Sequence, residues 1–163
     1  MLLSALIADQ ASVPLCRPLL FWWMLGFNVW GVEIDEARLR TAENSYKLVF
    51  NNPSLPSGLP YAQRDLSVNL HLKSVDDVEQ LPDGPLILYS FWEAIPVESK
   101  RAFGRLAATA DVKYIVIIGR NESDMEIRMT EAYDFPTLNL LEQFPVTQVG
   151  GGGQYQCYIF SVR

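Results

Sequence analysis

Short apolar runs alternate with amphipathic stretches along most of the chain. The runs predict buried strands because they are short, rich in branched or aromatic residues and bounded by turn formers. They lie at Leu2–Ala8, Asn28–Glu33, Val68–Lys73, Pro85–Phe91 and Val112–Gly119. Helix-like stretches separate them, and this alternation predicts an α/β fold with a largely parallel sheet.

The intervening stretches carry apolar positions three and four residues apart, as amphipathic helices do. Asp35 can cap one such helix, in which an apolar stripe runs from Leu39 to Val49. Pro96 suits the first turn of another. That helix is predicted over Pro96–Ala110, and the other predicted helices are Pro14–Leu25, Val75–Leu81 and Glu122–Ala132.

The end of the chain has a different pattern. Leu138–Val149 and Tyr155–Val162 read as two strands, and Gly150–Gly153 joins them, which predicts an antiparallel pair and a mobile hairpin loop. A terminal antiparallel insertion is typical of Rossmann-like methyltransferases. The fold class expected is therefore a Rossmann-like, mostly parallel sheet flanked by helices, with a C-terminal antiparallel hairpin. No repeat or linker divides residues 1–163, so we expect a single domain.

The apolar segment Val13–Trp30 does not read as a membrane span, because Pro14, Arg17, Pro18 and Asn28 interrupt it and a span needs roughly 20 apolar residues. No basic residue precedes Leu2–Ile7, so a secretory signal is not predicted either. We expect no membrane partner and an intracellular location, cytoplasmic or nuclear.

Charge and ligand chemistry narrow the function classes. Thirteen Lys and Arg against nineteen Asp and Glu give a net charge of −6, which disfavours direct nucleic-acid binding. Two cysteines, Cys16 and Cys157, lie at opposite ends, and there is one histidine, so neither a zinc site nor a disulfide framework is expected. His71 reads as a structural histidine rather than a metal ligand.

Glu33 is the most informative candidate. It ends a buried strand directly before a capped helix, at the carboxyl edge where open α/β sheets bind ligands. A carboxylate there can accept hydrogen bonds from both ribose hydroxyls of an adenosine-containing cofactor. The alternative is a solvated acid at the start of the helix.

The first strand–helix junction lacks the glycines that usually cradle a cofactor. The segment from Asp9 to Arg17 contains none, and the first glycine is Gly26. Asp9 ends the first predicted strand and could anchor a ligand amino group, or it is a surface turn residue. Either this loop binds a cofactor in an unusual way or the binding is lost.

Two further strand ends carry polar groups. Ser90 and Glu93 lie among the aromatic residues Phe91 and Trp92, an arrangement that can orient a polar group in an apolar pocket, with Glu93 a candidate general base. The aromatic pair can equally belong to the core. After the third strand, Ser74, Asp76 and Asp77 either lie near a bound nucleoside or cap the short acidic helix.

These residues resemble a known family. VWGVEIDEARLRTAENSY resembles the second cofactor segment of class I S-adenosylmethionine (SAM)-dependent methyltransferases. ILYSFWEAIP, FGRLAA, YIVIIGR and FPVTQVGGGGQYQCYIF are similar to segments of the histone lysine methyltransferases named for disruption of telomeric silencing.

The resemblance implies a site for SAM. It places Glu33 on the ribose and Asp76 or Asp77 near adenine, with Asp9 and Ser12 left from the glycine-rich first motif. It also places three residues beside the methionine end, as the catalytic set: Ser90, Phe91 and Trp92.

The function that follows from the resemblance is SAM-dependent methyl transfer to a protein lysine, such as a histone lysine. Phe91 and Trp92 would supply an apolar channel for the amine. Two alternatives stay open: an inactive methyltransferase-like interaction module, and a nicotinamide-dinucleotide-binding domain, which shares an acid after its second strand.

Overall fold

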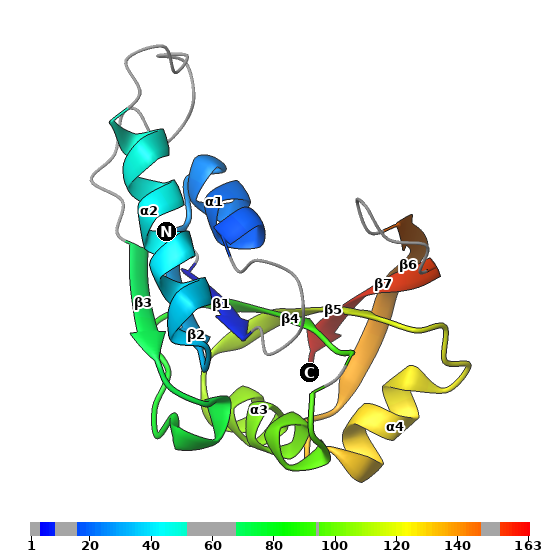
Figure 1. The fold of residues 1–163 in the computed structure, drawn as a ribbon. Coiled ribbons are helices and arrows are strands. Elements are labelled where there is room, and N and C mark those ends of the chain that lie inside the picture. Colours follow the sequence, from blue (N-terminus) through cyan, green and yellow to red (C-terminus); the bar gives the residue numbers. More distant parts are fainter. Residues whose placement is uncertain (1–3, 9–15, 52–67, 94, 148–153) are drawn as a thin grey trace.

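The computed structural model describes residues 4–8, 16–51, 68–93, 95–147 and 154–163. Its elements alternate between strands and helices, as the apolar pattern predicts (Figure 1). In chain order they are β1 (Ser4–Ala8), α1 (Cys16–Met24), β2 (Asn28–Glu33), α2 (Glu36–Phe50), β3 (Val68–Leu72), the 3₁₀ helix η2 (Val75–Asp77), β4 (Leu86–Phe91), α3 (Val97–Thr109), β5 (Val112–Gly119), α4 (Met125–Ala132), β6 (Leu138–Thr147) and β7 (Gln154–Val162).

The seven strands form one sheet in the order β3-β2-β1-β4-β5-β7-β6. The pairings from β3 to β5 are parallel, whereas β7 runs antiparallel to both of its neighbours, β5 and β6. The sheet is therefore mixed, where the sequence predicts a mostly parallel one. The two last strands do form the predicted antiparallel pair, and β7 is inserted between β5 and β6.

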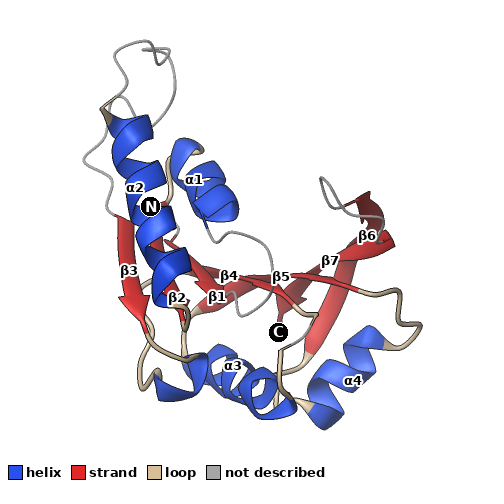
Figure 2. Ribbon diagram, viewed as in Figure 1, coloured by secondary structure: helices blue, strands red, loops and turns tan. Residues whose placement is uncertain are grey.

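Helices cover both faces of the sheet. Figure 2 shows α1 and α2 on one face and α3 and α4 on the other. The larger core lies beneath β4, β5 and β7 and is filled by apolar side chains of these strands, of α3 and of α4, among them Leu88, Ile117, Phe103 and Met129. A smaller core joins α1 and α2 to β2 around Trp23, Val29 and Ala42.

Two glycines allow turns or contacts that a side chain would obstruct. Gly26 follows α1 with φ of +92°, and its N–H donates to the carbonyl of Trp23, which closes the helix and directs the chain into β2. Gly104 lies where α3 passes the segment after α4. A Cβ on Gly104 would approach the carbonyl oxygen of Tyr133 to 1.9 Å, so only glycine permits this packing.

Several predicted helix ends are shifted. The acidic helix expected over Val75–Leu81 is only the three-residue η2. Its buried positions Val75, Val78 and Leu81 recur every third residue, which matches a 3₁₀ turn followed by extended chain better than an α-helix. The last helix begins at Met125 rather than Glu122, and a hydrogen bond from the Glu122 backbone N–H to the Tyr158 hydroxyl fixes Glu122 in the loop before it.

Candidate functional site

The parallel strands β1 to β5 end at one edge of the sheet, and the described ends of β2, β3, β4 and β5 carry polar side chains there. Glu33 ends β2, Asp76 and Asp77 follow β3, Glu93 follows β4 and Arg120 follows β5. This edge is where open α/β sheets bind their ligands. The fold therefore gathers most of the sequence-predicted site residues at one place.

Glu33 is fully buried at this edge, with no exposed surface. Its Oε1 accepts a hydrogen bond from the Asp35 N–H at 2.9 Å, while Asp35 itself caps α2 by accepting from the N–H groups of Ala37 and Arg38. The alternative interpretation of Glu33, a solvated acid at the start of the helix, is wrong, because Glu33 is buried and Asp35 caps α2. Within the described part of the chain, Glu33 Oε2 is buried and has no hydrogen-bond partner.

The electrostatics of Glu33 follow from this burial. Desolvation raises the pKa of Glu33, while the Asp35 N–H and the positive charge of Arg38 act in the opposite direction. A buried carboxylate oxygen without a donor is a costly feature in a folded protein. A ligand that brings hydroxyl donors would remove that cost, and the vicinal diol of a ribose brings two. The unused acceptor of Glu33 thus fits the hydroxyl donors of an adenosine cofactor's sugar.

Asp76 is occupied by structural hydrogen bonds. Its Oδ2 accepts from Ser99 Oγ at 2.6 Å and from Ser74 Oγ at 2.7 Å, which ties η2 to α3. Burial alone would raise the pKa of Asp76, but these hydroxyl donors outweigh it and hold the pKa below its usual value. Ser74 also caps η2 through the Asp76 N–H. Asp77 is exposed.

The expected catalytic set is buried at the end of β4. Ser90 is 1% exposed, and the Phe91 ring lies edge-on against Tyr155 with 5.2 Å between centroids. Trp92 is 3% exposed, and its ring packs against three aromatic side chains of the larger core, Phe103, Tyr133 and Phe135. Because core side chains surround the Trp92 ring, we do not retain Trp92 as a wall of an amine channel.

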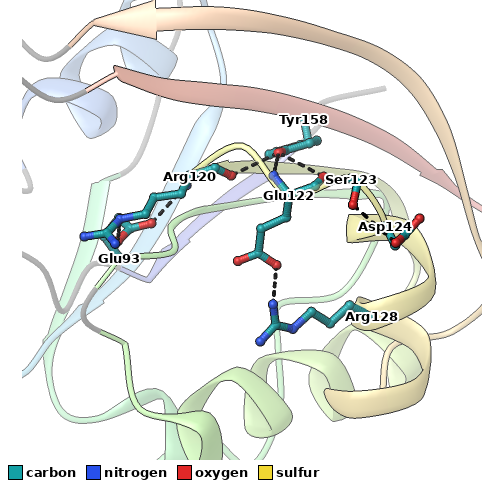
Figure 3. Close-up of polar contacts among 7 residues, drawn as sticks. All are labelled: Glu93, Arg120, Glu122, Ser123, Asp124, Arg128 and Tyr158. Carbon is teal, nitrogen blue, oxygen red and sulfur yellow. Dashed lines mark hydrogen bonds and ion pairs between the residues drawn. The ribbon is translucent and has the colours of Figure 1, made fainter.

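A polar cluster that sequence reasoning did not find connects the ends of β4 and β5 (Figure 3). Glu93 accepts from the Arg120 backbone N–H at 2.9 Å and pairs with Arg120 Nε at 3.1 Å. The Tyr158 hydroxyl, on β7, donates to the Arg120 carbonyl at 3.0 Å and accepts from the Glu122 N–H. The signal that identified Glu33, a charged residue at the end of a buried strand, could also have identified Arg120, which directly follows β5.

The remaining predictions concern other parts of the chain. Asp9 and Ser12 and the Gly150–Gly153 loop lie outside the described residues. His71 is exposed on β3 and its ring lies 5.0 Å from that of Trp30. Across the described ranges, no three His, Cys, Asp or Glu side chains are grouped as a metal site would need. None of the helices described here is both long and apolar enough to cross a bilayer.

Two cavities lined by described residues lie away from Glu33. One, of about 460 Å³, is bounded by the segment Glu79–Gly84 and by Thr109–Asp111, near the amino ends of β4 and β5. The other, of about 350 Å³, lies between α2 and the edge strand β3, beside Tyr46 and His71. Neither cavity includes a residue of the predicted cofactor site.

Comparison with known proteins identifies the fold. No family model and no curated protein sequence matches the chain. Solved structures do match. Magnesium protoporphyrin IX methyltransferase from Synechocystis, crystallised with bound SAM, is 12% identical, with a TM-score of 0.59 over 96% of this chain and 69% of that one.

Two further structures cover the chain almost completely. An rRNA methylase from Streptococcus thermophilus is 11% identical, with a TM-score of 0.55 over 98% of this chain and 88% of that chain. TrmN from Thermus thermophilus is 13% identical, with a TM-score of 0.60 over 99% of this chain but only 44% of TrmN. The chain therefore has the fold of SAM-dependent methyltransferases, and it spans between about half and nine-tenths of these proteins.

Proposed function

We propose that this chain is a SAM-dependent methyltransferase that holds the cofactor ribose with Glu33. One observation carries the proposal: a fully buried carboxylate at the end of β2 has one oxygen fixed by the Asp35 N–H and the other without a donor. The fold supports it, because magnesium protoporphyrin IX methyltransferase, which has this architecture, was crystallised with SAM and with S-adenosylhomocysteine.

The proposed roles of the chain's own residues are mainly those of binding and alignment. Asp35 holds the Glu33 carboxylate in one orientation through Oε1, which leaves the hydrogen-bonding capacity of the buried Oε2 for the diol of the cofactor. Ser90 and Phe91 lie at the end of β4, beyond β1 in the sheet, where the methionine part of the ligand would lie. When bound, SAM supplies an electrophilic methyl group, and its transfer needs little acid–base assistance from the protein.

The acceptor is a finer part of the proposal. A protein lysine, as in histones, remains the acceptor implied by the sequence resemblance, although the packing of Trp92 removes one of its supports. The names of solved neighbours mention a porphyrin, ribosomal RNA, tRNA and RNA, and none of these names mentions a protein substrate. Radiolabelled SAM offered with a lysine peptide, an RNA and small amines distinguishes these acceptor classes.

Calorimetric titration with S-adenosylhomocysteine tests the cofactor site directly. Wild-type protein should bind, and Glu33→Gln should weaken binding by about tenfold or more, because two charge-assisted hydrogen bonds to the diol are lost or weakened. Glu36→Gln is the matched control: Glu36 lies three residues along, on the exposed first turn of α2, and its replacement should leave affinity unchanged.

The same titration separates the alternatives. Binding of NAD in preference to S-adenosylhomocysteine would contradict the methyltransferase proposal and favour the dinucleotide binder. If neither ligand binds, the interaction-module alternative gains. Equal affinity of wild type and Glu33→Gln would remove Glu33 from the site.

A further inference from the structure

Arg120 has an unusually fixed backbone for a loop residue. Its N–H donates to Glu93, which follows β4, and its C=O accepts from the hydroxyl of Tyr158 on β7. Tyr158 is 1% exposed, so its hydroxyl is anchored in the core. Nearby, the Trp92 N–H donates to the Ile118 carbonyl at 2.7 Å, which extends the pairing of β4 and β5 up to this point. Three strands of the sheet thus determine where Arg120 lies.

The Arg120 side chain is also oriented. Its Nε pairs with Glu93 Oε2 at 3.1 Å, and Glu93 is only 26% exposed, whereas Arg120 is 78% exposed. Figure 3 shows the guanidinium lying beside the Glu93 carboxylate. Nε is the inner donor of the guanidinium, so among the described residues the two Nη groups remain without a partner. Two parallel N–H donors in one plane match the two oxygens of a carboxylate or phosphate.

The charged side chains around Arg120 balance one another. Glu93 lies near Lys100 as well as Arg120, and Glu122 pairs with Arg128 at 2.7 Å. These five side chains give three positive and two negative charges. Asp124, at the start of α4, accepts from Ser123, a neutral donor, and so adds a third negative charge. The cluster is therefore neutral overall in a chain whose net charge is −6, which leaves the Nη groups of Arg120 for one anionic group and no positive excess for a polyanion.

The location of Arg120 relative to Glu33 fits an acceptor site. Both lie at the carboxyl edge, and β1 and β4 separate β2 from β5. Three strand intervals of roughly 4.8 Å place the two residues on the order of 14 Å apart. A cofactor whose ribose contacts Glu33 reaches part of that way, toward β1 and β4. The acceptor would then occupy the remaining interval, between the reacting methyl group and Arg120.

We propose that Arg120, held by Glu93 and Tyr158, binds a single carboxylate or phosphate group of a small methyl acceptor. This inference rests on the proposed methyltransferase function, because that function makes the β4–β5 end of the edge the acceptor side. It makes a small anionic metabolite, rather than a nucleic acid, the substrate class. Arg120 acts as a binding and specificity residue and takes no part in the transfer itself.

Heteronuclear NMR of the arginine Nε–H signals tests this at constant ionic strength, with acetate and inorganic phosphate as probes. Each anion should shift the Arg120 signal saturably, and comparison of the two tells a carboxylate site from a phosphate site. The Arg120 Nε–H signal is absent from the Arg120 variants, so the backbone N–H signals of residues 120 and 122 report binding there, and Arg120→Gln should abolish saturable binding. Arg120→Lys should weaken it by about tenfold, because an ammonium keeps the charge but cannot form the parallel pair of hydrogen bonds.

Arg128→Gln is the matched control, since Arg128 is also exposed but already engaged by Glu122. It should leave anion binding at Arg120 unchanged. Arg105, an exposed residue of α3 that pairs with Asp134, gives a second comparison. Linear shifts of equal size at Arg120, Arg128 and Arg105 would overturn the proposal, and so would binding of a short RNA that Arg128→Gln weakens as much as Arg120→Gln. The S-adenosylhomocysteine titration is independent: anion binding without cofactor binding contradicts only the proposed function, and the reverse contradicts only this inference.

Discussion

Replacing Glu33 by Gln should change how the free energy of unfolding depends on pH. Burial raises the pKa of Glu33 in the folded chain, against the lowering effects of the Asp35 N–H and of Arg38. Between the unfolded and the folded pKa, the folded state holds a proton that the unfolded state has released. The free energy of unfolding therefore falls as the pH rises through this interval. Glutamine has no proton to lose, so this fall should disappear.

The structure sets the size of the effect through the burial of Glu33. Each unit by which the folded pKa exceeds the unfolded one destabilises the ionised protein by about 1.4 kcal/mol above both values. The Glu33→Gln substitution keeps the shape of the side chain and an oxygen that accepts from the Asp35 N–H. The difference between the two proteins thus isolates the cost of the buried charge. At alkaline pH, Glu33→Gln should lose less stability than wild type by that amount.

Urea unfolding from about pH 4 to about pH 8 measures this difference, since the range begins near the ordinary glutamate pKa. Glu36→Gln, an exposed acid in the first turn of α2, controls for the loss of one negative charge. Parallel pH curves for wild type and Glu33→Gln would refute the reasoning. They would mean that the carboxyl of Glu33 is solvated in solution.

Two further substitutions test the framework of the site. Gly104→Ala should cost about 3 kcal/mol in urea unfolding, because the new Cβ would clash with the Tyr133 carbonyl and neither backbone can move without disturbing α3. Tyr158→Phe should lower the free energy of unfolding by about 2 kcal/mol, because the Arg120 carbonyl and the Glu122 N–H both lose the Tyr158 hydroxyl as hydrogen-bond partner. An unchanged urea midpoint would contradict the close packing at Gly104 in the first variant and the hydrogen bonds of Tyr158 in the second.

The sequence predicts the strands of this fold well, because each buried strand needs a dense apolar run. Asn28–Glu33 and Val112–Gly119 have the predicted bounds. The helix ends are less predictable, since they depend on distant partners. Glu122 reads as the start of a helix, but its N–H donates to the hydroxyl of Tyr158, which lies 36 residues later.

Some features of the candidate site can likewise be predicted from the sequence, and others depend on the tertiary fold. The position of Glu33 follows from local order, a buried strand before a capped helix, and the sequence is enough to find it. The lack of a hydrogen-bond donor to Glu33 Oε2 depends on the tertiary fold, so the sequence does not predict it. The role of Trp92 depends on Tyr133 and Phe135, which come from another part of the chain, so the sequence leaves core and site open. Ser74 and Asp76 form the cap that the alternative interpretation predicts.

The insertion of β7 between β5 and β6 has a consequence for biosynthesis. A ribosome produces β6 before β7, yet β6 joins the sheet only through β7. A nascent chain can assemble β1 to β5, but β6 waits as an unpaired ribbon until residues 154–162 have emerged. A premature stop in β7 would therefore remove an internal strand and leave β6 unpaired. The remaining five-stranded sheet would expose the edge of β5, and such an intermediate is prone to aggregation and proteolysis.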